Sequence, residues 1–135
     1  MNSGVRPQNQ TSAYLWVGLG GFLGSVARFA VAVALPPAVN ARFPVASFAV
    51  NCIECLLIGV LTRVLARTSA PESFRLFLIT GVLGGFTTFS AFGLESLALL
   101  RRGDTTAAFL YILASVVLGV AAVWLGLRLA GSGEA

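Results

Sequence analysis

Residues 84–92 read Gly-Gly-Phe-Thr-Thr-Phe-Ser-Ala-Phe, and they interrupt a stretch that is otherwise apolar enough to cross a membrane. Glycine and β-branched threonine are poor helix formers, so the sequence predicts that the helix breaks here. A break inside hydrocarbon frees backbone amides and carbonyls, and it is tolerated only where protein, water or an ion satisfies those groups. Residues 84–92 are therefore the first candidate for a functional centre.

The composition predicts an all-α membrane protein. The chain has 135 residues, of which 57% are hydrophobic and 10% charged, with a mean hydropathy of +0.89. A helix needs roughly 20 apolar residues to span a bilayer, and four such stretches fit: Tyr14–Leu35, Ala46–Leu65, Phe74–Leu100 and Thr105–Leu129. We expect a four-span domain over residues 14–130, a disordered N-terminal tail over residues 1–13 and a C-terminal tail over residues 131–135. A signal peptide ending near residues 30–32 is less favoured, because three more spans follow.

The charged residues favour lipid contact over nucleic-acid binding or catalysis. The net charge of +4 comes from arginine alone, and the arginines are scattered at span ends, where they anchor to headgroups. The chain contains no histidine, which removes the commonest general base and zinc ligand. Without a nucleophile–base pair, an enzyme is not expected. Cys52 and Cys55 have C-x-x-C spacing, but inside a span we interpret them as small apolar packing residues.

The distribution of arginine gives little preference for one orientation in the membrane. One side has five arginines and the other has three: Arg6, Arg63, Arg67, Arg75 and Arg128 against Arg42, Arg101 and Arg102. So weak a positive-inside bias is compatible with insertion both ways and pairing as an antiparallel dimer. A weakly preferred orientation with the N-terminus inside is the alternative.

Several polar or small residues of the first two spans are candidates for function or helix packing. Gly20 and Gly24 form a G-x-x-x-G motif that lets another helix approach closely. Arg28 either is structural or attracts anions. Asn51 can donate hydrogen bonds to an anion or join helices. Glu54 is an intramembrane carboxylate, commonly a proton or cation site; the alternatives are a protonated carboxyl group, a pair with an arginine, or a position nearer the interface.

In the third span, the break and the residues after it suggest two different sites. Carbonyls from Gly84 to Thr87 are oxygens of the kind that hold sodium at unwound transporter helices. Phe89 and Phe92 share a helical face, either as core packing or with their positive ring edges toward an anion. Glu95 lies one helical step further on the same side.

The fourth span carries two hydroxyls on one face. Tyr111 and Ser115 are spaced i,i+4 in an otherwise apolar helix, so they either line a path or join helices. We expect Gly119 and Gly126 to be helix-packing positions.

Taken together, these motifs resemble the bacterial fluoride channel family (Fluc, also called CrcB). The resemblance rests on three separated motifs: residues 20–24 with Arg28, Asn51 with Gly59, and residues 80–92 with Glu95. The third motif is long and specific. The resemblance implies a passive, fluoride-selective channel in the inner membrane that exports fluoride from the cytoplasm and lowers its toxicity.

The resemblance also implies a dual-topology, antiparallel homodimer with the third helix broken mid-membrane. A sodium ion at the dimer centre would be held by the backbone carbonyls of Gly84 and Thr87. The residues along the fluoride path would be Asn51, Phe89, Ser90, Phe92, Tyr111 and Ser115. Arg28 and Glu95 would be vestibule or structural charges.

Four residues depart from the family pattern, and one of them supports a different function. Glu54 stands where a small residue is expected, Ala91 replaces a residue that is often hydroxylated, and Gly119 and Val123 stand where hydroxyls are expected. The alternative is a small proton-coupled multidrug transporter that uses Glu54 or Glu95. Such transporters usually place their carboxylate in the first span, which here has only Arg28. A non-transporting scaffold is less favoured still, because the break needs a partner.

Overall fold

The computed structural model describes residues 7–35 and 43–131, and these residues are almost entirely helical. Four helical segments among them are long and apolar enough to span a membrane, which confirms the predicted number: Gln10–Ala34, Val45–Arg67, Glu72–Arg101 and Thr105–Leu129. The chain is thus a multi-pass membrane protein. Some residues named in the predictions lie outside the described residues: the tail residues 1–6, which include Arg6, the tail residues 132–135, and Arg42 of the first loop.

The first helix begins earlier than predicted. α1 spans Pro7–Ala34, so the expectation of a disordered tail is wrong for residues 7–13. Pro7 occupies the first position of the helix, where a missing N–H is no loss. The polar residues that follow contain no helix breaker, so α1 continues beyond the apolar stretch from which the prediction was made.

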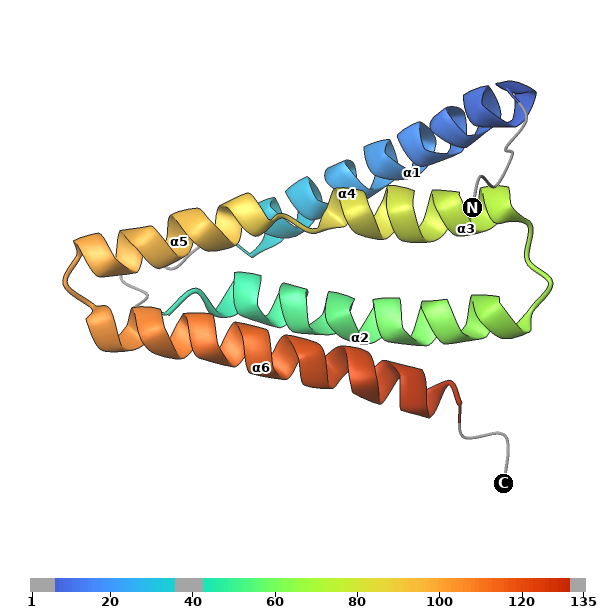
Figure 1. Ribbon diagram of the computed structural model, residues 1–135. Coiled ribbons are helices and arrows are strands. Elements are labelled where there is room, and N and C mark those ends of the chain that lie inside the picture. The colour runs from blue at the N-terminus through green and yellow to red at the C-terminus, as the bar shows by residue number, and fades with distance from the viewer. Residues whose placement is uncertain (1–6, 36–42, 132–135) are drawn as a thin grey trace.

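The second and fourth spans are single helices, and the third is composite. α2 spans Val45–Arg67 and α6 spans Thr105–Leu129. The third span consists of α3 (Glu72–Arg75), the π-helix η1 (Leu76–Leu83), α4 (Gly84–Phe86) and α5 (Phe89–Arg101). The spans form two parallel pairs, α1 beside the third span and α2 beside α6 (Figure 1).

Glycines bring α1 against the third span, as the G-x-x-x-G motif predicted. A Cβ on Gly20 would lie 2.2 Å from the Phe77 carbonyl oxygen, and one on Gly24 would lie 2.1 Å from that of Val82. On the facing helix, a Cβ on Gly85 would lie 2.6 Å from the Gly21 carbonyl oxygen. Only glycine permits backbones to approach this closely.

A second glycine contact joins α2 to α6. A Cβ on Gly59 would lie 2.3 Å from the Val123 carbonyl oxygen, and one on Gly126 would lie 2.3 Å from that of Leu56. Near the middle of the pair, Cys55 Sγ faces Gly119. The predictions that Gly119 and Gly126 are packing positions are confirmed, and both cysteines are free thiols.

The turn after α5 folds α6 back beside it. Gly103 has a φ of +82°, and its N–H donates to the Leu100 carbonyl at 3.0 Å. The N–H of Asp104 donates to the Leu99 carbonyl, also at 3.0 Å. This pair of hydrogen bonds is a Schellman motif, for which a left-handed glycine is the preferred residue.

Most of the apolar surface is not covered by the chain itself. A small core of Leu99, Ala108 and Tyr111 lies between α5 and α6. In the most apolar window of each span, no more than 17% of the residues are buried. The remaining apolar faces therefore contact lipid or another protein.

Candidate functional site

The break in the third span falls on two threonines. Thr87 (φ −73°, ψ 156°) and Thr88 (φ −151°, ψ 114°) are extended, between the end of α4 and the start of α5. The helix is thus interrupted at Thr87 and Thr88, whereas Gly84 to Phe86 remain helical. Of the two glycines, Gly85 serves close packing, since it lies against α1.

Hydroxyls of the threonines stabilise the helix ends on either side of the break. Thr88 Oγ1 accepts a hydrogen bond from the Ala91 N–H at 3.3 Å, which caps the N-terminus of α5. The same hydroxyl lies 2.7 Å from Ser90 Oγ. Thr87 Oγ1 donates to the Leu83 carbonyl at 3.4 Å. Ser90 was predicted to lie on an ion path. Its side chain is exposed, and its hydroxyl is hydrogen-bonded to that of Thr88.

The carbonyl oxygens of Gly84 and Thr87 lie at the break. In the described part of the chain, no backbone hydrogen bond of a turn, loop or helix cap ends on the carbonyl oxygen of Gly84 or Thr87. Carbonyl oxygens are ligands that hard cations accept. No group of three or more His, Cys, Asp or Glu residues within the described ranges could hold a metal ion, so cation binding here depends on backbone oxygens and single side chains.

The π-helix before the break was not predicted. Its last turn is visible in the Gly84 N–H, which donates to the carbonyls of both Gly81 and Ile79. The apolar sequence of Leu76–Leu83 carries no signal that distinguishes a π-helix from an α-helix. π-helical turns often occur at functional sites, and only the short α4 separates this one from the break.

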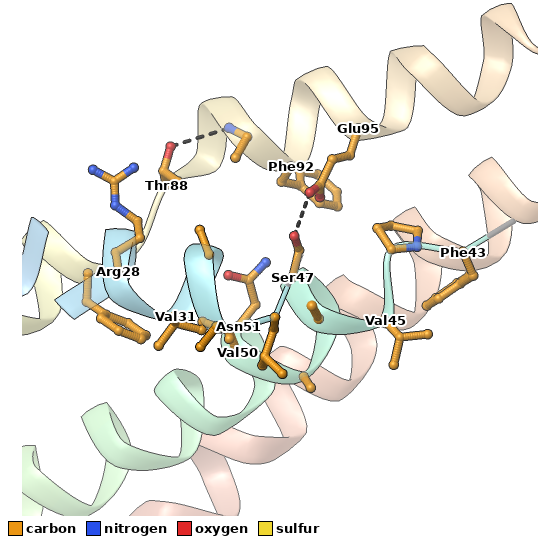
Figure 2. A pocket seen from close by; sticks show the side chains of 18 residues that line it. Arg28, Val31, Phe43, Val45, Ser47, Val50, Asn51, Thr88, Phe92 and Glu95 are labelled. Carbon is orange, nitrogen blue, oxygen red and sulfur yellow. Dashed lines mark hydrogen bonds between the residues drawn. The ribbon is translucent and has the colours of Figure 1, made fainter. Parts of the chain in front are cut away.

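A cavity of about 770 Å³ opens between α1, α2 and the residues around the break. Figure 2 shows its polar side chains: Arg28 from α1, Ser47 and Asn51 from α2, and Thr88 and Glu95 from the third span. Most of the remaining lining is apolar, including Phe92. The structure therefore brings together four predicted site residues from three spans: Arg28, Asn51, Phe92 and Glu95.

Glu95 joins three spans through its two carboxylate oxygens. Ser47 Oγ donates to Oε1 at 2.5 Å (Figure 2), and the Tyr111 hydroxyl donates to Oε2 at 2.7 Å. Tyr111 is 0% exposed and is not part of the cavity lining. Its hydroxyl is engaged behind the cavity wall rather than open to an ion. Sequence reasoning missed Ser47, because no motif marks it.

The two phenylalanines after the break differ in their surroundings. Their ring centroids lie 5.5 Å apart, with the planes tilted by 34°. Phe92 lines the cavity and packs against Tyr111 at 5.2 Å. Phe89 is 83% exposed, so within this chain it has little to pack against except Phe92.

Two buried side-chain atoms have no hydrogen-bond partner among the described residues: Glu54 Oε2 and Ser115 Oγ. Cys55 on α2 faces Gly119 on α6. Asn51 lies one helical turn before Cys55, and Ser115 lies one helical turn before Gly119. Glu54 is 4% exposed and interacts with the side chain of Thr87 at the break.

Comparison with known proteins identifies the family. Residues 15–127 match the family model described as CrcB-like protein, Camphor Resistance (CrcB). A relative from Novosphingobium aromaticivorans is 49% identical over 123 residues, which cover 87% of this chain and 95% of the relative. One from Methylobacillus flagellatus is 47% identical over 116 residues, covering 84% and 90%.

A third relative, from Acidobacterium capsulatum, is 44% identical over 115 residues, covering 84% of this chain and 92% of its own length. All three bear the name fluoride-specific ion channel FluC. The match extends over all four spans and the break between α4 and α5. The chain belongs to the CrcB-like family.

Proposed function

We propose that this protein is a fluoride-selective ion channel that lets fluoride leave the cytoplasm passively across the inner membrane, which lowers its toxicity. The observation that carries the proposal is the 44–49% identity to FluC channels over at least 84% of the chain. Such channels are not enzymes.

The chemistry of the cavity suits a small, strongly hydrated anion. Fluoride gives up its water only where donors replace it, and the Asn51 amide at the cavity wall is such a donor. The ring edge of Phe92 adds a weak positive field. Conduction needs binding that is neither absent nor tight, and a ring edge meets that condition better than a fixed cation. The exposed Arg28 lies on the α1 wall, where it attracts anions toward the cavity.

The functional unit in this proposal is an antiparallel homodimer of dual topology. The support is the exposed apolar surface, above all Phe89, which is 83% exposed beside a cavity lined by Phe92. In the dimer a second copy covers Phe89, and the ion path combines Phe89, Ser90, Phe92, Asn51 and Ser115, with Tyr111 behind the wall. The orphan hydroxyl of Ser115 is available to an ion, whereas the Tyr111 hydroxyl acts through Glu95.

A sodium ion at the dimer centre belongs to the same proposal. The residues fit it, because the carbonyl oxygens of Gly84 and Thr87 accept no turn, loop or cap hydrogen bond in the described chain. Bound sodium would supply a fixed positive charge near the path, which favours anions. The mid-membrane position of the break is also part of the proposal, supported by its place half-way along Glu72–Arg101.

The alternative of a proton-coupled multidrug transporter gains no support. Of its two candidate carboxylates, Glu95 already accepts hydrogen bonds at both oxygens, and Glu54 is buried on α2. The relatives are named as channels and not as transporters.

Fluoride efflux from liposomes tests the proposed function. Purified protein is reconstituted into vesicles loaded with potassium fluoride, and valinomycin carries the compensating potassium. We expect rapid efflux measured by a fluoride electrode, and no efflux when chloride replaces fluoride. Vesicles that release fluoride no faster than protein-free controls would contradict the proposal.

A further inference from the structure

Glu54 is an acidic side chain that the proposed fluoride path does not use. It lies on α2 in the second span and is 4% exposed. Its Oε2 atom is one of two buried side-chain polar atoms in the described chain that lack a partner. An unpartnered carboxylate in an apolar interior is costly, and such groups are normally paired or coordinate an ion.

No cationic side chain neutralises Glu54. Within residues 7–35 and 43–131, no arginine forms an ion pair with it, and the sequence contains no lysine or histidine. Arg28 lines the cavity wall on α1, and Arg63 is exposed near the C-terminal end of α2. Within the described residues, Glu54 is therefore neutral only when its carboxyl group binds a proton or a cation from outside the chain.

The oxygens around Glu54 are those that a small, hard cation prefers. The carboxylate interacts with the side chain of Thr87, and α2 packs against η1, which leads into the break. The carbonyl oxygens of Thr87 and Gly84 accept no turn, loop or cap hydrogen bond within the described residues. Carboxylate, hydroxyl and carbonyl oxygens are all ligands of hard cations.

We propose that Glu54 contributes an anionic oxygen to the cation site at the Thr87 break, so that in this chain the bound cation is held by a carboxylate as well as by backbone carbonyls. The inference rests on the proposed function, whose sodium site uses the carbonyls of Gly84 and Thr87. The site with Glu54 differs from that sodium site in its net charge, because carbonyls alone leave the cation's charge uncompensated. With Glu54 present, the cation binds more tightly and the buried carboxylate is neutralised.

Thermal unfolding of the purified protein in detergent, measured at increasing sodium, tests the inference. Choline chloride keeps the ionic strength constant. A ligand that binds only the folded protein stabilises it in proportion to the logarithm of its concentration above Kd. We expect the midpoint of unfolding to rise with sodium, and Glu54→Gln to require at least tenfold more sodium for the same rise. Glu72→Gln removes a carboxylate at an exposed helix start, and we expect it to follow the wild type.

Two outcomes would overturn the inference. One is a sodium dependence of Glu54→Gln equal to that of the wild type, and the other is a wild type whose midpoint does not respond to sodium. If Glu54→Gln does not fold, Glu54→Asp decides, because its shorter side chain keeps the charge but withdraws the oxygen from Thr87. We expect Glu54→Asp to need more sodium than the wild type, and an unchanged requirement overturns the inference.

Fluoride efflux from liposomes made with the same wild-type preparation separates this inference from the proposed function. Efflux without any sodium response overturns the inference and leaves the channel intact. Absence of efflux overturns the channel, whereas a sodium response that depends on Glu54 would still support the cation site.

Discussion

The third span makes different contacts before and after its break. Before the break, η1 and α4 meet α1 through backbone atoms at glycines. After the break, Glu95 of α5 accepts hydrogen bonds from Ser47 of α2 and Tyr111 of α6. The first contact depends mainly on shape, with one side-chain hydrogen bond from Ser25 Oγ to the Gly85 carbonyl at 3.4 Å. The second leaves a cavity of about 770 Å³ whose wall carries hydrogen-bonding side chains. The difference teaches that the third span is held by close backbone contact before the break and by polar side chains after it.

The largest effect on stability is expected in the glycine contact. Gly24→Ala places a Cβ 2.1 Å from the Val82 carbonyl oxygen, a backbone atom that cannot move aside. Overpacking typically costs about 1–3 kcal/mol, and we expect this variant at or above the upper end. Thermal unfolding in detergent measures the loss.

Gly18→Ala is the matched control on the same helix. A Cβ on Gly18 meets nothing within 4 Å, and alanine is the better helix former. We expect its unfolding midpoint to equal or exceed that of the wild type. Equal losses in the two variants would show that the close contact between α1 and the third span does not determine stability.

The next effect is expected among the side chains that hold α5. Tyr111→Phe leaves Glu95 Oε2 without its donor, and an unpaired buried acceptor costs about 1–3 kcal/mol. We expect Tyr111→Phe to lower the unfolding midpoint. Adding Glu95→Leu to this variant should lower the midpoint by less than Glu95→Leu does alone. Tyr14→Phe, on an exposed ring of α1, should change nothing. Additive losses in the double variant would contradict a coupled pair.

A smaller effect is expected at the start of α5. Thr88→Ala removes the side-chain acceptor of the Ala91 N–H, and loss of an N-cap costs about 1 kcal/mol. Hydrogen exchange of the first-turn amides of α5 should become faster, with little change in α6. Thr88→Ser keeps the hydroxyl and should restore protection. Protection that is unchanged in Thr88→Ala would show that α5 does not depend on this cap.

The parts of the fold that follow from local sequence were predictable. Apolar stretches gave the four spans, and the G-x-x-x-G spacing at Gly20 and Gly24 correctly indicated a close helix contact. The interruption falls inside residues 84–92, where it was predicted, but on the threonines and not on the glycines of that stretch. Thr88 caps α5 with its hydroxyl, while Gly85 is needed for contact with α1.

The features that arise between distant segments could not be predicted. Ser47 and Glu95 are 48 residues apart, and nothing in the sequence indicates which hydroxyl reaches the carboxylate. For Tyr111 this left two interpretations open, lining a path or joining helices, and its hydroxyl bond to Glu95 favours the second. The π-helix of Leu76–Leu83 packs against α1, and a run of apolar residues indicates neither the π-helix nor that contact.

Fluoride efflux from liposomes that contain Phe92→Ile tests the central claim most directly, since Phe92 is the aromatic side chain after the break that lines the cavity. Isoleucine keeps the residue apolar but removes the ring edge that faces an anion. Phe109→Ile is the matched control, because that ring is 66% exposed on α6 and outside the cavity lining. The account predicts that Phe92→Ile loses fluoride efflux while remaining folded, and that Phe109→Ile releases fluoride as the wild type does. Efflux through Phe92→Ile at the wild-type rate would contradict a fluoride path along this face of α5.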